Sequence, residues 1–167
     1  GGTLKYLLDN GINVTPIEKV TGFKEMIGGS VKTLHPNIHG GILYIRDDKG
    51  HENEISSEGI KPIDIVVCNL YRFQETVAKN PSLEDAIENI DIGGVTLLRA
   101  AAKNFKYVTV IVDPLDYDIV TKELLENGNT SYETRKKLCV KAFSHTADYD
   151  SAIDSYLSEA LTDNKKL

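Results

Sequence analysis

The sequence has little cysteine and no long apolar run. Cys68 and Cys139 are its only cysteines, too few for a disulfide framework or a cysteine-rich metal site, and Cys68 lies inside an apolar run. We therefore predict that both are buried thiols of a reducing compartment. No stretch reaches the roughly 18 apolar residues of a membrane-spanning helix, and no signal peptide is present. The sequence predicts a soluble, cytoplasmic protein with no membrane partner.

Positive charge is also scarce. The net charge is −6, the isoelectric point is about 5.2, and the basic runs are short, as at Lys136-Lys137 and Lys165-Lys166. A groove for nucleic acid or a surface for anionic lipid needs a larger basic patch, so neither partner is expected. A small anionic ligand that a few local cations hold remains compatible with this composition.

The chain has 167 residues, of which 41% are apolar, enough for one sizeable core. The β-branched run 63–70 follows Pro62 and is typical of a buried parallel strand. Further strands are predicted at 12–17 and 107–112. Helices are predicted at 4–8, 21–27 (a single turn), 83–90, 95–104, 114–127, and from 130 through 145 toward 161. Ser82 with Asp85 and Thr130 with Glu133 resemble capping boxes, and Asp113-Pro114 is a common pair at a helix start. The polar residues 46–58 lack periodicity, as expected for a solvated excursion. Strands that alternate with helices indicate an α/β fold with a mostly parallel sheet flanked by helices.

The most unusual stretch is residues 28–41, GGSVKTLHPNIHGG, which holds four glycines, one proline, two histidines and a lysine. It has neither a helical nor a strand periodicity, so we predict a loop that contacts a ligand. Lys32 and Thr33 would supply a cation and a hydroxyl, although most loop lysines are simply solvated. His35 and His39 are four apart, but no carboxylate or cysteine lies close enough in sequence to complete a metal site. No metal is expected.

Other candidate residues lie where strands are predicted to end or helices to begin. Gly1-Gly2-Thr3 precedes a helix and offers backbone N–H groups and a hydroxyl, which suits a phosphate but also an ordinary turn. Asp91-Ile92-Gly93-Gly94 places a carboxylate beside a flexible backbone, although Asp91 could equally be an N-cap. Lys103 could simply be a cation that compensates a helix dipole, and Tyr71 could be a core aromatic.

Six stretches, taken together, resemble one family in the same order. They are GGT, VTGFKEM, VKTLHPNIHGGIL, DIVVCNLYRF, IENIDIGGVTLLRAAAKN and KAFSHTADYDSAI. They resemble the inosine monophosphate (IMP) cyclohydrolase domain of the bifunctional purine-biosynthesis enzyme, whose other half is a formyltransferase. The resemblance covers the whole chain. It implies a three-layer α/β fold like that of methylglyoxal synthase, with residues 1–167 forming one such domain and the formyltransferase domain absent.

The resemblance also implies a reaction, a set of partners and a site. The family closes the second purine ring without a cofactor, converting 5-formamidoimidazole-4-carboxamide ribonucleotide to IMP and water in the last step of de novo purine biosynthesis, usually as a homodimer. The residues that match the family's catalytic positions are Lys32, Tyr71, Asp91 and Lys103. The phosphate-binding positions match Gly2, Thr3 and Thr33, and the base contacts match Asn69, Ile92 and Gly93.

The implied chemistry suits these residue types. A carboxamide nitrogen is a poor nucleophile, so its attack on the formyl carbon needs a base and a donor for the oxygen. Asp91 would act as the base or orient the amide, while Lys32 and Tyr71 would stabilise or protonate the formyl oxygen. Lys103 is harder to place, because a straight helix would hold it about 18 Å from Asp91. Either the helix breaks, the lysine reaches back, or Lys103 serves a neighbouring subunit's site.

The chain also departs from the family pattern. The domain ordinarily begins with two strands and a phosphate loop that are missing here, which makes it N-terminally incomplete. Ser30 stands where the family has an arginine that holds phosphate, and Arg72 stands where it has a proline. These departures favour an alternative, a catalytically compromised nucleotide-binding or regulatory module of the same fold. Retention of all four catalytic matches favours the enzyme.

Overall fold

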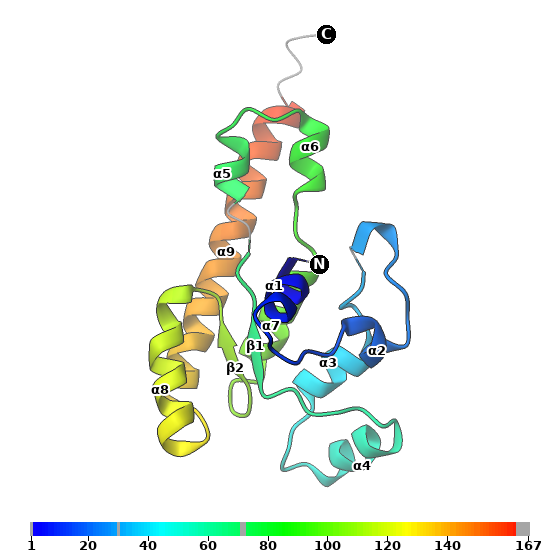
Figure 1. The fold of residues 1–167 in the computed structure, drawn as a ribbon. Helices are drawn as coiled ribbons and strands as arrows, with labels where there is room; N and C mark the ends of the chain where they lie inside the picture. The colour runs from blue at the N-terminus through cyan, green and yellow to red at the C-terminus, as the bar shows by residue number, and fades with distance from the viewer. Residues whose placement is uncertain (1, 30, 71–72, 163–167) are drawn as a thin grey trace.

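The structure, a computed structural model, describes residues 2–29, 31–70 and 73–162. Ser30, Tyr71 and Arg72, on which the sequence makes predictions, lie outside the described residues. Two parallel strands lie at the centre, with helices packed around them, and one long helix, α9, runs along most of the molecule (Figure 1). The predicted α/β class is confirmed, with a smaller sheet in the described part of the chain than the sequence suggested.

The sheet pairs β1 (Ile65–Val67) with β2 (Thr109–Ile111), in a register that sets Val66 opposite Val110. Parallel strands need a crossover connection, and here it runs through helices that return the chain to the start of β2. These helices are α5 (Phe73–Val77), α6 (Leu83–Glu88) and α7 (Gly93–Lys103). The strand predictions at 63–70 and 107–112 are confirmed in place, although each strand is shorter.

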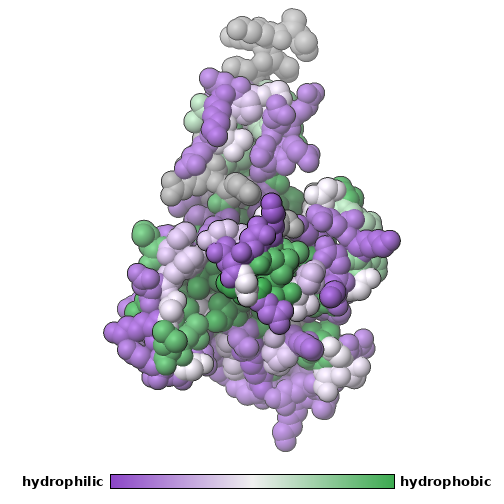
Figure 2. Space-filling view, viewed as in Figure 1, coloured by the Kyte–Doolittle hydropathy of each residue, from purple (hydrophilic) through white to green (hydrophobic). Residues whose placement is uncertain are grey.

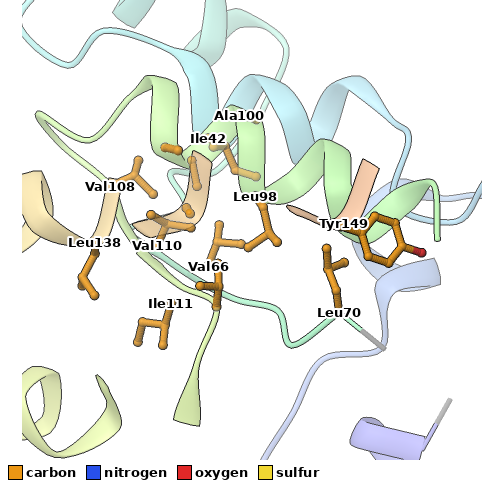
Figure 3. Packing of buried hydrophobic residues seen from close by; sticks show 14 of the residues in the cluster. Ile42, Val66, Leu70, Leu98, Ala100, Val108, Val110, Ile111, Leu138 and Tyr149 are labelled. Carbon is orange, nitrogen blue, oxygen red and sulfur yellow. The ribbon is translucent and has the colours of Figure 1, made fainter. Parts of the chain in front are cut away.

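The core lies between the strands, α7 and α9 (Tyr132–Thr162). Figure 3 shows Leu98 from α7 close to Val66 and Val110 of the two strands, and all three side chains are buried. The Ala100–Ala102 segment of α7 is also buried, because small side chains let α9 approach closely. The helix predicted at 95–104 is confirmed, and its apolar face explains why it lies at the centre.

Local capping signals were right at two helices and wrong at a third. Ser82 accepts a hydrogen bond from the Asp85 amide and begins α6, as predicted. Asp113 accepts one from the Leu115 amide and begins the short 3₁₀ helix η2 (Pro114–Asp116). For α9, however, Ser131 and not the predicted Thr130 accepts a hydrogen bond, from the Thr134 amide. The Thr130 side chain is instead buried against Thr109, at an Oγ1–Oγ1 distance of 2.7 Å.

The remaining helices surround this centre. They are α1 (Gly2–Asp9), α2 (Ile17–Thr21), the 3₁₀ helix η1 (Ile27–Gly29), α3 (Pro36–Leu43), α4 (Lys49–Ser57) and α8 (Tyr117–Asn127). Among them α3 packs against α7, and α2 packs against α3. Helix α1 has no buried residue, and Figure 2 shows apolar side chains gathered on the surface where Figure 1 places it.

Two predictions near the start of the chain were wrong. Residues 12–16 form no strand, because the Pro16 carbonyl accepts the Lys19 amide and α2 begins at the next residue. The helical turn predicted at 21–27 is also absent, because Gly22 adopts a φ of 71° and ends α2. Pro16 begins a helix where the short apolar alternation predicts a strand, and the left-handed Gly22 ends that helix where the sequence predicts a further turn.

The stretches predicted as loops also contain helices. Within residues 28–41, α3 begins at Pro36, and His35 Nδ1 accepts the Asn37 amide at 3.1 Å. Gly41 of α3 allows close packing, because a Cβ at this position would overlap the Lys61 carbonyl oxygen. The polar stretch 46–58, predicted as an unstructured excursion, forms α4 behind an Asp48 cap, although that helix has no buried residue. Capping and proline at the first turn outweighed the missing periodicity.

Candidate active site

Asp91 lies at the start of α7, held from two sides. Its Oδ1 accepts the Gly94 amide at 2.7 Å, and its own amide donates to the Tyr149 hydroxyl at 2.8 Å. The N-cap prediction for Asp91 is one residue off, because the N-cap position of α7 is Ile92 and the Asp91 side chain caps the helix from the position before it. The second carboxylate oxygen, Oδ2, makes no hydrogen bond to any residue that the structure describes. One oxygen thus caps the start of α7, and the other has no such structural task.

Gly94 brings this carboxylate against the end of β1. A Cβ at Gly94 would lie 2.5 Å from Asp91 Oδ2, 2.8 Å from Leu70 Cδ2 and 2.9 Å from Cys68 Sγ. Real Cβ atoms do not approach other atoms so closely, so only glycine allows the helix start to sit here. The chemistry-bearing end of α7 is therefore packed directly on the carboxyl end of a parallel strand, where α/β folds bind ligands.

Two side chains beside Asp91 were not among the predicted site residues. Burial, with the nearby Asp91 charge as a smaller cause, raises the pKa of Cys68 to about 11, so this thiol is neutral near pH 7. Burial likewise raises the pKa of Tyr149, which keeps its hydroxyl protonated. Cys68 carried a signal, since it stands near the end of the predicted strand. Tyr149 carried none, because it lies 58 residues from Asp91.

Thr33 joins the glycine-rich stretch to this helix start. A Cβ on Gly93 would lie 2.8 Å from Thr33 Oγ1, so the hydroxyl rests directly against the first residue of α7. Ile92, at the preceding position, is 53% exposed and has no capping hydrogen bond. The structure therefore brings four predicted residues together: Thr33, Asp91, Ile92 and Gly93.

A separate hollow collects the predicted phosphate-binding residues at the start of the chain. Its volume is about 470 Å³, and Gly2 and Thr3 at the start of α1 line it together with Lys32. The Lys32 ammonium lies 3.4 Å from Glu25 Oε1. A helix N-terminus, a hydroxyl and a cation around one hollow are the features that bind phosphate. Thr33, the next residue after Lys32, is the one that contacts Gly93 at the start of α7.

Asn69 and Lys103 do not join this group. Asn69 donates to the Tyr117 hydroxyl at 3.0 Å and lines a different hollow, of about 660 Å³, with Lys141 and His145. Lys103 is exposed at the opposite end of α7 from Asp91. Because α7 is continuous, its ends are about 15 Å apart at 1.5 Å per residue. A break in the helix is therefore not the explanation, and a lysine side chain is too short to span the gap.

The remaining predictions concern metals, membranes and residues that the structure does not describe. In the described part of the chain, no three side chains of His, Cys, Asp or Glu gather as a metal site would require. None of its helices combines the length and apolar character needed to cross a bilayer. Gly1, Ser30 and Tyr71 lie outside the described residues, so their predicted roles stay predictions.

Comparisons with known proteins show which family this chain belongs to. The MGS-like domain family matches residues 1–96, and the AICARFT/IMPCHase bienzyme family matches residues 101–167. The bifunctional purine biosynthesis protein PurH of Bacillus cereus (strain B4264) is 57% identical over 162 residues, which are 96% of this chain and 32% of that protein. PurH of Bacillus anthracis (strain CDC 684 / NRRL 3495) is 56% identical over the same shares.

A solved structure is similar as well. The crystal structure of ForH superposes with a TM-score of 0.79 at 37% sequence identity, covering 92% of this chain and 80% of that one. The chain spans about a third of the length of the curated relatives that it matches, 32% in each case. It belongs to the MGS-like domain family, in the form that occurs in the AICARFT/IMPCHase bienzymes of purine biosynthesis.

Proposed function

We propose that this chain performs the IMP cyclohydrolase step, closing the ring of 5-formamidoimidazole-4-carboxamide ribonucleotide to give IMP and water. One observation carries the proposal: the Asp91 carboxylate sits at the start of α7 against the end of β1, with one oxygen bonded to Gly94 and the other without a described partner. The substrate class is supported by relatives that are named as bifunctional purine biosynthesis proteins. The reaction needs no cofactor, and we expect it in the cytoplasm.

In this mechanism Asp91 Oδ2 takes a proton from the carboxamide nitrogen as that nitrogen attacks the formyl carbon. The formyl oxygen gains negative charge, and the Lys32 ammonium stabilises and protonates it, with Tyr71 as a second donor. The resulting hydroxyl takes a second proton, from the carboxylic acid of Asp91, and leaves as water. The former formamide nitrogen gives its proton to Lys32, which restores both side chains. Gly2, Thr3 and Thr33 would bind the phosphate, and Ile92 and Gly93 the base. Asn69 is left out of this site, because it lines a different hollow. Cys68, a neutral thiol, takes no covalent part.

The test is turnover of the formylated ribonucleotide, followed by ultraviolet absorbance. Asp91→Asn keeps an oxygen that can accept the Gly94 amide while removing the base, so we expect the chain to stay folded and kcat to fall at least about 100-fold. Ser82→Ala is the matched control, because it removes a helix cap of similar geometry from α6, away from the site. Equal kcat for Asp91→Asn and wild type would reject the mechanism.

Binding separates the enzyme from the alternative module. Calorimetry with IMP should show binding to wild type whether or not the chain turns over substrate. A folded chain that binds IMP without turnover would be the compromised nucleotide-binding module, and Ser30→Arg would then be the first repair to attempt. A chain that neither binds IMP nor turns over substrate would reject both functions.

Lys103 is assigned to the site of a second copy in a homodimer, since it cannot reach Asp91 of its own chain. Mixing Asp91→Asn with Lys103→Ala subunits creates dimers in which one site holds both native residues. If half of the dimers are mixed and each has one intact site, activity should return to about a quarter of wild type. Recovery that stays at the level of the separate variants would place Lys103 outside the reaction.

A further inference from the structure

Glu25 and Lys32 lie on the two sides of a tight turn. The chain reverses through η1, where Gly28 and Gly29 have φ values of 60° and 92°. The reversal brings Glu25 Oε1 to 3.4 Å from Lys32 Nζ, and the two side chains are 43% and 34% exposed. Because Lys32 lines the hollow with Gly2 and Thr3, the carboxylate engages the same cation that a ligand in that hollow would meet.

The two glycines of the turn do different things. A Cβ on Gly29 would overlap the Glu25 carboxylate and lie 3.3 Å from Lys32 Nζ. A Cβ on Gly28 would meet nothing within 4 Å, although its backbone is left-handed too. Glycine is therefore required at both positions by conformation, but only at Gly29 by space. The ion pair between Glu25 and Lys32 occupies the space that a side chain at position 29 would need.

We propose that Glu25 is a positioning residue for Lys32, holding its ammonium at the border of the hollow, and that Gly29 provides the room for this contact. The inference rests on the proposed function, because it matters to catalysis only if Lys32 acts on the substrate. A lysine on a free loop samples many rotamers, and a carboxylate partner selects those that point its ammonium in one direction. A reacting group that is misplaced by about 1 Å can lose much of its rate contribution.

One arm of the test does not depend on activity. Brief acetylation of the full chain with acetic anhydride, read by peptide mass spectrometry, measures how freely Nζ of Lys32 is presented, with Lys24 as an internal reference. Glu25→Gln removes the charge that holds the ammonium, and Gly29→Ala pushes the carboxylate away. Each should raise labelling of Lys32 about threefold relative to Lys24, and Gly29→Ala should add little to Glu25→Gln, since exposed ion pairs are weak and both changes break the same one.

Gly28→Ala is the matched control, because it carries the same left-handed strain without touching the pair. It should leave Lys32 labelling at the wild-type level. In kinetics, Glu25→Gln and Gly29→Ala should lower kcat about fivefold with KM within about twofold, since Glu25 orients Lys32 and does not touch substrate. A merely structural turn would predict equal effects of the two glycine substitutions.

The outcomes distinguish a failure of the positioning role of Glu25 from a failure of the proposed function. Unchanged Lys32 labelling in Glu25→Gln overturns the positioning role, as does equal labelling in Gly28→Ala and Gly29→Ala. Raised labelling with unchanged kcat in an active enzyme also overturns it, because the contact then has no catalytic consequence. A wild-type chain without turnover would reject the proposed function, and a labelling pattern as expected would then assign Glu25 only to the orientation of a ligand-binding lysine.

Discussion

The two charged groups proposed to act on the substrate are held in opposite ways. Asp91 is fixed by a backbone amide, a buried tyrosine hydroxyl and a helix start that only glycine permits. Lys32 is half exposed on a turn, and one ion pair at 3.4 Å holds it. The difference suits their tasks, because a base must meet one nitrogen in a single geometry, whereas a cation can follow an oxygen that moves as it leaves.

The largest effect on stability and turnover should come from Gly94→Ala, which disturbs the firmly held Asp91. The new methyl group would press on Asp91 Oδ2, Leu70 and Cys68 at once. We expect the free energy of unfolding to fall by about 2 to 3 kcal/mol, and turnover to be lost. Urea denaturation and the absorbance assay measure these.

Gly93→Ala is the control for that substitution, since its methyl group meets only the Thr33 hydroxyl. The gain in helix propensity should offset that contact, leaving the free energy of unfolding within about 1 kcal/mol of wild type. Equal destabilisation by both substitutions would show that the end of β1 does not fix the start of α7.

A smaller effect is expected from Tyr149→Phe, which removes the acceptor of the Asp91 amide. An amide left without a partner in a partly buried place should cost about 1 to 2 kcal/mol of unfolding free energy. Tyr156→Phe is matched to it, because both tyrosine rings pack edge-on against Phe73 and the Tyr156 hydroxyl bonds to no described residue. If Tyr149→Phe and Tyr156→Phe lower the free energy of unfolding by equally small amounts, the Asp91 amide needs no fixed acceptor.

On the adjustable side, Lys32→Met should barely change stability, by less than about 1 kcal/mol, because half-exposed ion pairs contribute little. Its affinity for IMP should nevertheless fall about tenfold, as one charge-assisted contact is lost. Calorimetric titration measures this, with Lys24→Met as an exposed lysine outside the hollow. If Lys32→Met binds IMP as tightly as wild type does, Lys32 does not contribute to IMP binding.

The last effect appears only at high pH. The pKa of Cys68 rises from 9.0 to about 11 on folding, chiefly through burial, so the folded state retains a proton that the unfolded chain releases. The stabilisation from this thiol is complete below pH 9 and is lost as the pH rises toward 11. The free energy of unfolding should therefore fall more steeply over that interval in wild type than in Cys68→Ser. Parallel curves would show that the thiol is not held neutral by the fold.

Local signals predicted the elements of this fold that depend on local forces. The β-branched run at 63–70 predicted the buried strand, and Ser82 and Asp113 predicted helix starts. The errors arose where short signals conflicted. Residues 12–16 alternate like a strand, but Pro16 begins a helix there.

The site was harder to predict for a different reason. Asp91 and Thr33 stood out by resemblance and by local context, but their contact partners depend on folding. Nothing local connects Asp91 to Tyr149, or Thr33 to Gly93, because packing alone brings them together. The same holds for Lys103, whose separation from Asp91 followed from helix geometry once the helix was known to be continuous.

The link between Asp91 and Tyr149 also orders events in time. Helix α9 holds α7 near both ends, through that hydrogen bond and through Cys139 Sγ, which lies 3.1 Å from the Ala102 carbonyl. A chain that emerges from the ribosome completes α7 well before Tyr149 exists. The Asp91 carboxylate, the proposed base, therefore reaches its final orientation only after most of α9 has been made and docked, in the same step that completes the core.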